Sequence, residues 1–129
     1  MNRRAKGKSG QKKRRFVMLP LDVLNHDDYI SLSMKSKVLL VDVLRQYQGY
    51  NNGDLSITLS VMKKSGWTSN ASLTAAKNEL INAGLLVLTR QGGRNQCSLY
   101  GVTFQSIDGC SNKLEVPPTS SPLRAFSKK

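Results

Sequence analysis

Within residues 68 to 104 the spacing of the apolar residues changes from that of a helix to the alternation of a strand. This change constrains the fold more than any other feature of the sequence. The helical part carries one apolar stripe, formed by Leu73, Ala76, Leu80 and Ala83. Thr68 or Ser69 can cap the helix at its start, and Gly84 is the residue type that ends one. We therefore predict a helix over residues 69 to 83.

The sequence after Gly84 predicts a β-hairpin. Residues 85 to 90 form an apolar strand, residues 91 to 95 contain Gly92 and Gly93 as a turn, and residues 96 to 104 return with strand alternation. Positive charge and polar donors surround the turn, supplied by Arg90, Gln91, Arg94 and Asn95. An ordinary solvent-exposed turn would carry similar residues.

A helix preceded by a short one is predicted upstream. Ser33 can cap the longer helix, which should end near Gly49. Its apolar face is formed by Met34, Val38, Val41 and Leu44, and is widened by Leu40 and Tyr47. Met34 is expected in the core. The short helix is expected around residues 21 to 25.

The segment between these helices predicts one more strand and one more helix. Residues 55 to 57 alternate as a short strand would, and Thr58 can cap a helix that Gly66 closes. We expect Met62 to face the core and Trp67 to anchor the following turn.

Charge divides the chain into three parts. Residues 1 to 15 hold eight basic residues and no acidic one, whereas residues 16 to 104 hold eight basic and six acidic residues. The first part has too little apolar surface to offset the entropy of ordering, so we expect a disordered basic arm. Residues 16 to 104 form the single domain, and the Ser-, Pro- and Lys-containing residues 105 to 129 are expected to be a flexible tail.

The order of these elements resembles the winged helix-turn-helix family. The most specific stretches are residues 50 to 53, 82 to 86 and 89 to 95, which are similar to those of small helix-turn-helix proteins of phages, plasmids and conjugative elements. The resemblance implies an α+β, mainly α fold: a three-helix core with a C-terminal hairpin, the wing, and a short extra strand. It also implies that the third helix enters the major groove of DNA and that the wing contacts backbone or minor groove.

The residues of the third helix suit that role. The side opposite the apolar stripe is small and uncharged, being formed by Ala71, Thr74, Ala75, Asn78 and Asn82. Small residues allow close approach to base edges, and the amide of Asn78 matches the donor and acceptor of adenine. A start rich in Thr, Ser and Asn presents backbone amides to a phosphate, although the same residues are common as plain helix caps.

The predicted partner is double-stranded DNA, with transcriptional regulation as the use. The expected contacts of the recognition helix are Thr68, Ser69, Asn70, Ala71, Thr74, Ala75, Lys77 and Asn78. The expected contacts of the wing are Arg90, Gln91, Arg94 and Asn95. The arm would neutralise phosphates without choosing a sequence, through Arg3, Arg4, Lys6, Lys8, Lys12, Lys13, Arg14 and Arg15.

Other functional classes find little support in the residues. Cys97, Cys110 and His26 do not have the spacing of a zinc site, and His26 has no nucleophile or metal-ligand motif near it. We therefore expect neither an enzyme nor a cofactor, metal or small-molecule ligand. The longest apolar runs are too short to span a bilayer, so a cytoplasmic protein without membrane contact is expected.

Three alternatives stay open. The same domain could serve a replication or partition factor of a mobile element, or an RNA-binding module, since basic arms also bind RNA. It could also be a protein-interaction module without nucleic-acid binding. No long coiled-coil helix is visible, so we expect a weak homodimer or a monomer that pairs on DNA.

Overall fold

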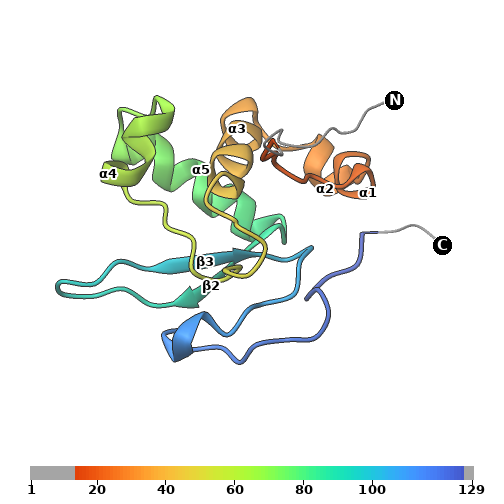
Figure 1. Cartoon of the computed structure of the whole chain (residues 1–129). Helices are drawn as coiled ribbons and strands as arrows, with labels where there is room; N and C mark the ends of the chain where they lie inside the picture. The colour runs from red at the N-terminus through yellow and green to blue at the C-terminus, as the bar shows by residue number, and fades with distance from the viewer. Residues whose placement is uncertain (1–13, 127–129) are drawn as a thin grey trace, which may run out of the picture.

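In the computed structural model, which describes residues 14–126, helices come first along the chain and a two-stranded antiparallel sheet follows (Figure 1). The elements are α1 (Leu21–Leu24), α2 (Asp27–Ile30), α3 (Met34–Leu44), α4 (Leu59–Met62) with the 3-10 turn η1 (Lys63–Ser65), α5 (Asn70–Asn82), β2 (Leu86–Arg90), β3 (Leu99–Val102) and the 3-10 turn η2 (Cys110–Asn112). The predicted α+β, mainly helical class is confirmed. The helix α2 had not been predicted.

The predicted starts of α3, α4 and α5 are confirmed by their caps, whereas the prediction that the α3 helix ends near Gly49 is wrong, because α3 ends at Leu44. The side-chain oxygens of Ser33, Thr58 and Ser69 each accept a hydrogen bond from the backbone N–H three residues further on, at 3.2–3.4 Å. Gly66 and Gly84 follow η1 and α5 with φ of +98° and +79°, which an L side chain adopts only with strain. These signals lie within a few residues of each boundary, so the local sequence is enough to place them.

The core lies between α3, α5 and the sheet, and it corrects the predicted face of α3. Met34 and Val38 are 70% and 52% exposed. The buried face contains Leu40 and Leu44, as predicted, together with Ser36, Leu39 and Val43. Helix α3 has apolar residues on opposite sides, and buried Ser36 interrupts the face that packs on α5. The Ser36 hydroxyl is satisfied by donating to the carboxylate of Glu79.

Trp67 anchors the turn before α5, as predicted. Its side chain is 9% exposed, and its indole Nε1–H donates to Oδ2 of Asp42 at 2.8 Å. Asp42 is also buried, and its other oxygen lies 3.1 Å from Nε of Arg45. This contact ties the start of α5 to α3, and so fixes the direction in which α5 leaves the turn.

The predicted extra strand is reduced to one bridge. Leu55 exchanges both backbone hydrogen bonds with Tyr100 of β3, at 3.1 and 2.8 Å. At the next residue the side chain of Gln46 takes the place of a strand partner, because its amide donates to the carbonyl of Ser56 at 2.7 Å and accepts from its N–H at 2.8 Å. The chain then turns into α4.

Asn52 fixes the base of the hairpin. Its buried side-chain amide donates to the carbonyls of Val102, Gln105 and Ser106 at 3.0–3.2 Å, and accepts from the N–H of Val102 at 2.8 Å. A side chain with both donors and acceptors is needed here, because each of these backbone groups would otherwise be buried unpaired.

The hairpin turns two positions later than predicted. Gly93 and Gln96 exchange hydrogen bonds at 2.9 and 3.2 Å, so Arg94 and Asn95 form the tip, and Asn95 adopts the positive φ of +62°. Gly92 has a different role. A Cβ built there would lie 2.5 Å from the backbone nitrogen of Ser98, so the two strands approach too closely for any side chain.

The segment after Gln105 packs against the domain, which corrects the predicted flexible tail for residues 105–126. Ile107 and Phe126 are 2% and 4% exposed, and Arg124 donates to the carbonyl of Ala83 at 2.9 Å and to the carboxylate of Asp28. That carboxylate has its pKa lowered mainly by the bond to Arg124. Figure 1 shows the segment running back beneath the sheet. Single apolar residues among Ser and Pro gave no periodic signal for this packing.

Candidate nucleic-acid interface

The outer side of α5 is exposed as predicted. Leu73, Ala76 and Leu80 are at most 3% exposed and form the inner side. The residues on the opposite side are all exposed: Asn70, Ala71, Thr74, Ala75, Asn78 and Asn82. No charged side chain belongs to this face. The outer side of α5 therefore presents about three turns of small or amide side chains, and the two charged residues of the helix, Lys77 and Glu79, lie off this side.

One flank of this face is a trough between α5 and the hairpin. It has a volume of about 200 Å³, and α5 contributes Asn70, Thr74 and Lys77 to its wall. The hairpin contributes Cys97 and Ser98. Lys77 extends across the trough, with Nζ at 5.8 Å from the ring centroid of Tyr100. A cation at that distance is attracted by the ring, which holds the lysine beside the outer face.

The other flank lies between α5 and the start of α3. Two shallow depressions of about 190 and 300 Å³ follow this side, and Lys35 and Ser72 line both. Nζ of Lys35 donates to Oγ of Ser72 at 3.3 Å. Sequence reasoning did not identify Lys35, because only the packing of α3 on α5 brings it beside the predicted recognition face. Lys35 and Lys77 thus lie on opposite flanks of that face.

The charges of the domain are unevenly distributed. Residues 55–107, which contain α4, α5 and the hairpin, hold one carboxylate, Glu79, and five basic residues: Lys63, Lys64, Lys77, Arg90 and Arg94. The other seven carboxylates of the chain lie before residue 55 or after residue 107. The half of the domain that contains the candidate site is therefore the half suited to a polyanion.

Glu79 is held by the start of α3. Its carboxylate accepts from the backbone N–H of Ser33 at 3.2 Å, from the Ser33 hydroxyl at 2.7 Å and from the Ser36 hydroxyl. These bonds, the one from Ser36 first, lower the pKa of Glu79 below its usual value. The partial positive charge at the start of a helix also favours a carboxylate there. The single negative charge of residues 55–107 is thus engaged within the protein.

The four predicted wing residues divide into two pairs. Arg94 and Asn95 are exposed at the tip. Arg90 is half-buried, and its Nη2 donates to the carbonyl of Cys97 at 2.8 Å, so it braces the two strands. The backbone N–H of Gln91 donates to the carboxylate of Glu115 at 3.0 Å, although the Gln91 side chain remains exposed. The tip is the part of the wing that is open to a ligand.

The remaining predicted residues are Thr68, Ser69 and those of the arm. Thr68 is exposed, whereas the hydroxyl oxygen of Ser69 is occupied by capping α5. Arg14 and Arg15 of the arm are exposed. The other six arm residues lie outside the described residues: Arg3, Arg4, Lys6, Lys8, Lys12 and Lys13.

Among residues 14–126, no cluster of three or more His, Cys, Asp or Glu side chains could hold a metal ion. No helix in this range combines the length and hydropathy that crossing a bilayer requires. No protein family, curated protein or solved structure matches the chain.

Proposed function

We propose that this is a winged helix-turn-helix protein that binds double-stranded DNA through α5 and uses the binding to regulate transcription. The observation that carries the proposal is the exposed, uncharged outer side of α5, flanked by Lys35 and Lys77. B-DNA has a major groove about 12 Å wide that admits an α-helix, and a phosphate backbone runs along each of its edges. Small side chains between two flanking cations fit that arrangement.

The chemistry of the outer side favours contact with bases. The amide of Asn78 can pair with adenine through two hydrogen bonds, and the methyl groups of Thr74, Ala71 and Ala75 can contact thymine. The hairpin tip, with Arg94 and Asn95, extends beyond the sheet and would reach the neighbouring backbone or minor groove (Figure 1). Double-stranded RNA fits less well, because its major groove is deep and narrow.

The experiment is selection of duplexes from a randomised pool, followed by affinity measurements on a selected duplex and its scrambled version. Thr74→Ala with Asn78→Ala should reduce the discrimination between the two duplexes by about 1–3 kcal/mol, the usual value of a lost bidentate base contact. Asn25→Ala is the control, since Asn25 is an exposed residue after α1, outside the proposed interface. It should leave the discrimination unchanged.

Three outcomes would contradict the proposal. Equal loss of affinity on both duplexes would remove the case for base contacts by α5. Stronger binding to a structured RNA than to the selected duplex would favour an RNA-binding module. Binding to neither nucleic acid would favour a protein-interaction module. Mapping the bound sites relative to promoters and origins separates regulation from replication or partition.

A further inference from the structure

The exposed apolar side chains are concentrated near the N-terminus of the described chain. Eleven large hydrophobic residues are exposed, and seven of them lie between residues 16 and 38: Phe16, Val17, Met18, Leu21, Ile30, Met34 and Val38. Single exposed apolar residues are ordinary, but a group within one short stretch of a small domain is typical of an interaction surface.

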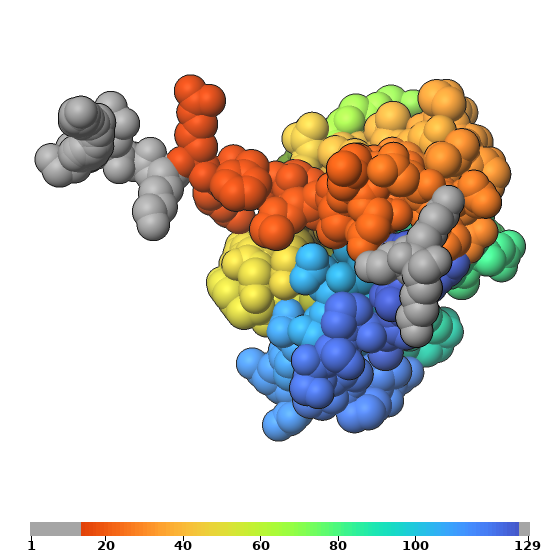
Figure 2. Space-filling view, turned by 90° about the vertical axis from the view of Figure 1, so that its right-hand side faces the viewer, coloured from red at the N-terminus to blue at the C-terminus, as the bar shows by residue number. Residues whose placement is uncertain are grey.

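Two of these residues form the outward stripe of α3. Met34 and Val38 are one helical turn apart, on the side of α3 opposite the core residues Leu39 and Val43. Nothing among residues 14–126 covers them, since their exposed fractions are 70% and 52%. In Figure 2 the first described residues, drawn in red, stand out from the body of the molecule.

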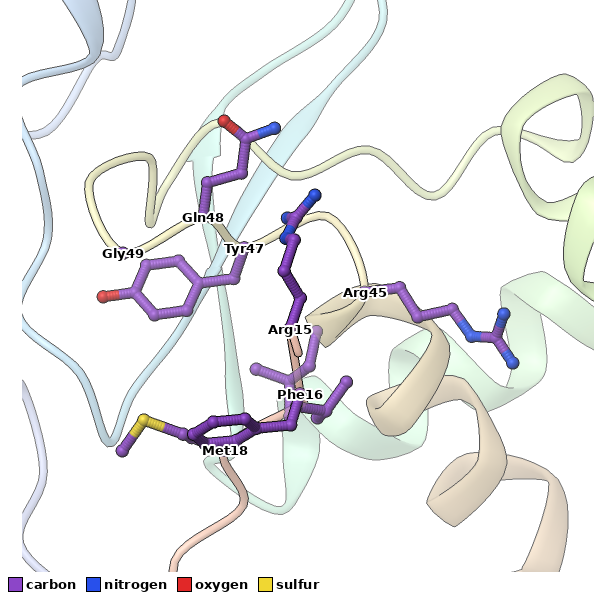
Figure 3. A pocket seen from close by; sticks show the side chains of 9 residues that line it. Arg15, Phe16, Met18, Arg45, Tyr47, Gln48 and Gly49 are labelled. Carbon is purple, nitrogen blue, oxygen red and sulfur yellow. The ribbon is translucent and has the colours of Figure 1, made fainter. Parts of the chain in front are cut away.

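The segment before α1 also borders a pocket. The pocket has a volume of about 410 Å³, and its apolar lining comes from this segment and from the end of α3: Phe16, Val17, Met18, Leu44 and Tyr47 (Figure 3). Phe16 remains 80% exposed. Arg15 adds a positive charge to the pocket wall, whereas the guanidinium of Arg45 is paired with the carboxylate of Asp42. An occupant with apolar and acidic side chains would therefore fit.

The adjacent segment of the same chain has that composition. Helices α1 and α2 expose Leu21 and Ile30, which are 69% and 55% accessible, and the exposed carboxylate of Asp27 lies between them. An apolar, basic surface is thus followed directly by an apolar, acidic one. In a dimer with two-fold symmetry, the apolar, basic surface of each copy can contact the apolar, acidic surface of the other copy. The two contacts are equivalent and form at once.

We propose that residues 14–30 and the outward stripe of α3 form the interface of a homodimer. The Phe16 pocket of one copy receives the α1–α2 surface of the second, and the exchange is reciprocal. This inference goes beyond the proposed DNA binding and does not depend on it. It leaves the hairpin tip free, because α1 and α2 lie on the side of the molecule away from that tip (Figure 1), but it assigns Arg15, a predicted DNA contact of the arm, to the dimer surface.

The test is sedimentation equilibrium of the full chain, without DNA, from low micromolar to several hundred micromolar protein. The wild-type protein should show a concentration-dependent monomer–dimer equilibrium. Phe16→Ser with Met18→Ser should raise the dissociation constant at least about tenfold, as expected for removal of two interface anchors. Leu123→Ser is the matched control, since Leu123 is 50% exposed but lies in the C-terminal segment. Circular dichroism checks that each variant is folded.

A charge exchange tests the reciprocal contact. Arg15→Glu and Asp27→Lys should each weaken the dimer, because each places like charges opposite one another. The double variant should dimerise more tightly than either single variant, since the pair is restored with reversed signs. A wild-type protein that stays monomeric throughout, a Phe16/Met18 variant equal to the Leu123 control, or a double variant no tighter than the single ones would each overturn the proposal. Dimerisation is measured without DNA, so its result does not depend on DNA binding. The Leu123 control should both dimerise and bind DNA as the wild type does, so a failure of DNA binding is distinguishable from a failure to dimerise.

Discussion

At the scale of single residues, the domain depends on buried polar side chains whose partners are distant in the sequence. Asn52 binds backbone groups about fifty residues away, and Glu79 binds the start of α3. In the sequence Asn52 was noted only as part of the stretch 50 to 53 that resembles the helix-turn-helix family, and Glu79 had no predicted role. Both were missed for the same reason: a polar side chain shows no periodicity, and its hydrogen-bond partners are known only once the helices are packed.

Glu79 makes stability depend on acid. The pKa of Glu79 is lowered in the folded protein. The ionised carboxylate therefore stabilises the fold above pH 4.5, which is its usual pKa, and this stabilisation is lost as the pH falls through the lower pKa of the folded protein. Thermal melts of the wild type and Glu79→Gln should therefore differ near neutral pH and converge in acid. A difference in melting temperature that stays constant down to strongly acidic pH would show that the charge of Glu79 is irrelevant. Asp28→Asn is a second acid-dependent variant, because the Asp28 pKa is also lowered.

At the scale of elements, local signals predicted where helices begin and end better than which side they bury. The caps at Ser33, Thr58 and Ser69 and the sides of α5 were predicted, because each depends on residues within one element. The buried side of α3 could not be predicted, since both of its sides are apolar. The candidate site was likewise predicted only in part. The exposed face of α5 could be predicted, because it lies opposite the apolar stripe of the same helix. Lys35 could not, because it reaches the site only through the packing of α3 on α5.

The contact between Trp67 and Asp42 sets the position of α5. In Trp67→Phe the ring still fills the core, but one buried carboxylate oxygen of Asp42 loses its donor. We expect the free energy of unfolding to fall by about 1–3 kcal/mol, the usual cost of a buried polar atom left unpaired. Urea denaturation measures the change. Tyr29→Phe is the control, because Tyr29 is a partly buried aromatic residue of α2 that packs against the core but does not contact Asp42 in any hydrogen bond. An unchanged midpoint in Trp67→Phe would show that the hydrogen bond contributes nothing.

At the scale of the whole molecule, the arrangement of charge matters more than its total of +12. Residues 55–107 hold five basic residues and one carboxylate, while the other seven carboxylates lie before residue 55 or after residue 107. The C-terminal segment secures this arrangement, because Arg124 joins the carboxylate of Asp28 to the end of α5. The basic side and the proposed dimer surface are therefore held on separate parts of one small domain.

The salt dependence of DNA binding tests this arrangement. Lys35→Ala and Lys77→Ala should each reduce the slope of log affinity against log salt by about 0.9, the value for one lost phosphate contact. Lys37→Ala is a matched control, since Lys37 and Lys77 are both half-buried and lie 5.4 and 5.8 Å from a tyrosine ring centroid. Lys37 lies outside both flanks of α5, so the slope of log affinity against log salt for Lys37→Ala should equal that of the wild type. Equal slopes for all three variants would contradict the proposed backbone contacts.

The most direct measurement is photo-crosslinking to a selected duplex from a reactive side chain placed at residue 75. Ala75 is exposed on the uncharged outer side of α5, so the account predicts crosslinks to bases in the major groove. The same reactive side chain at Lys37 should give none. Crosslinks to bases from residue 37 but not from residue 75, or crosslinks from residue 75 only to the sugar–phosphate backbone, would contradict the claim that α5 touches the bases.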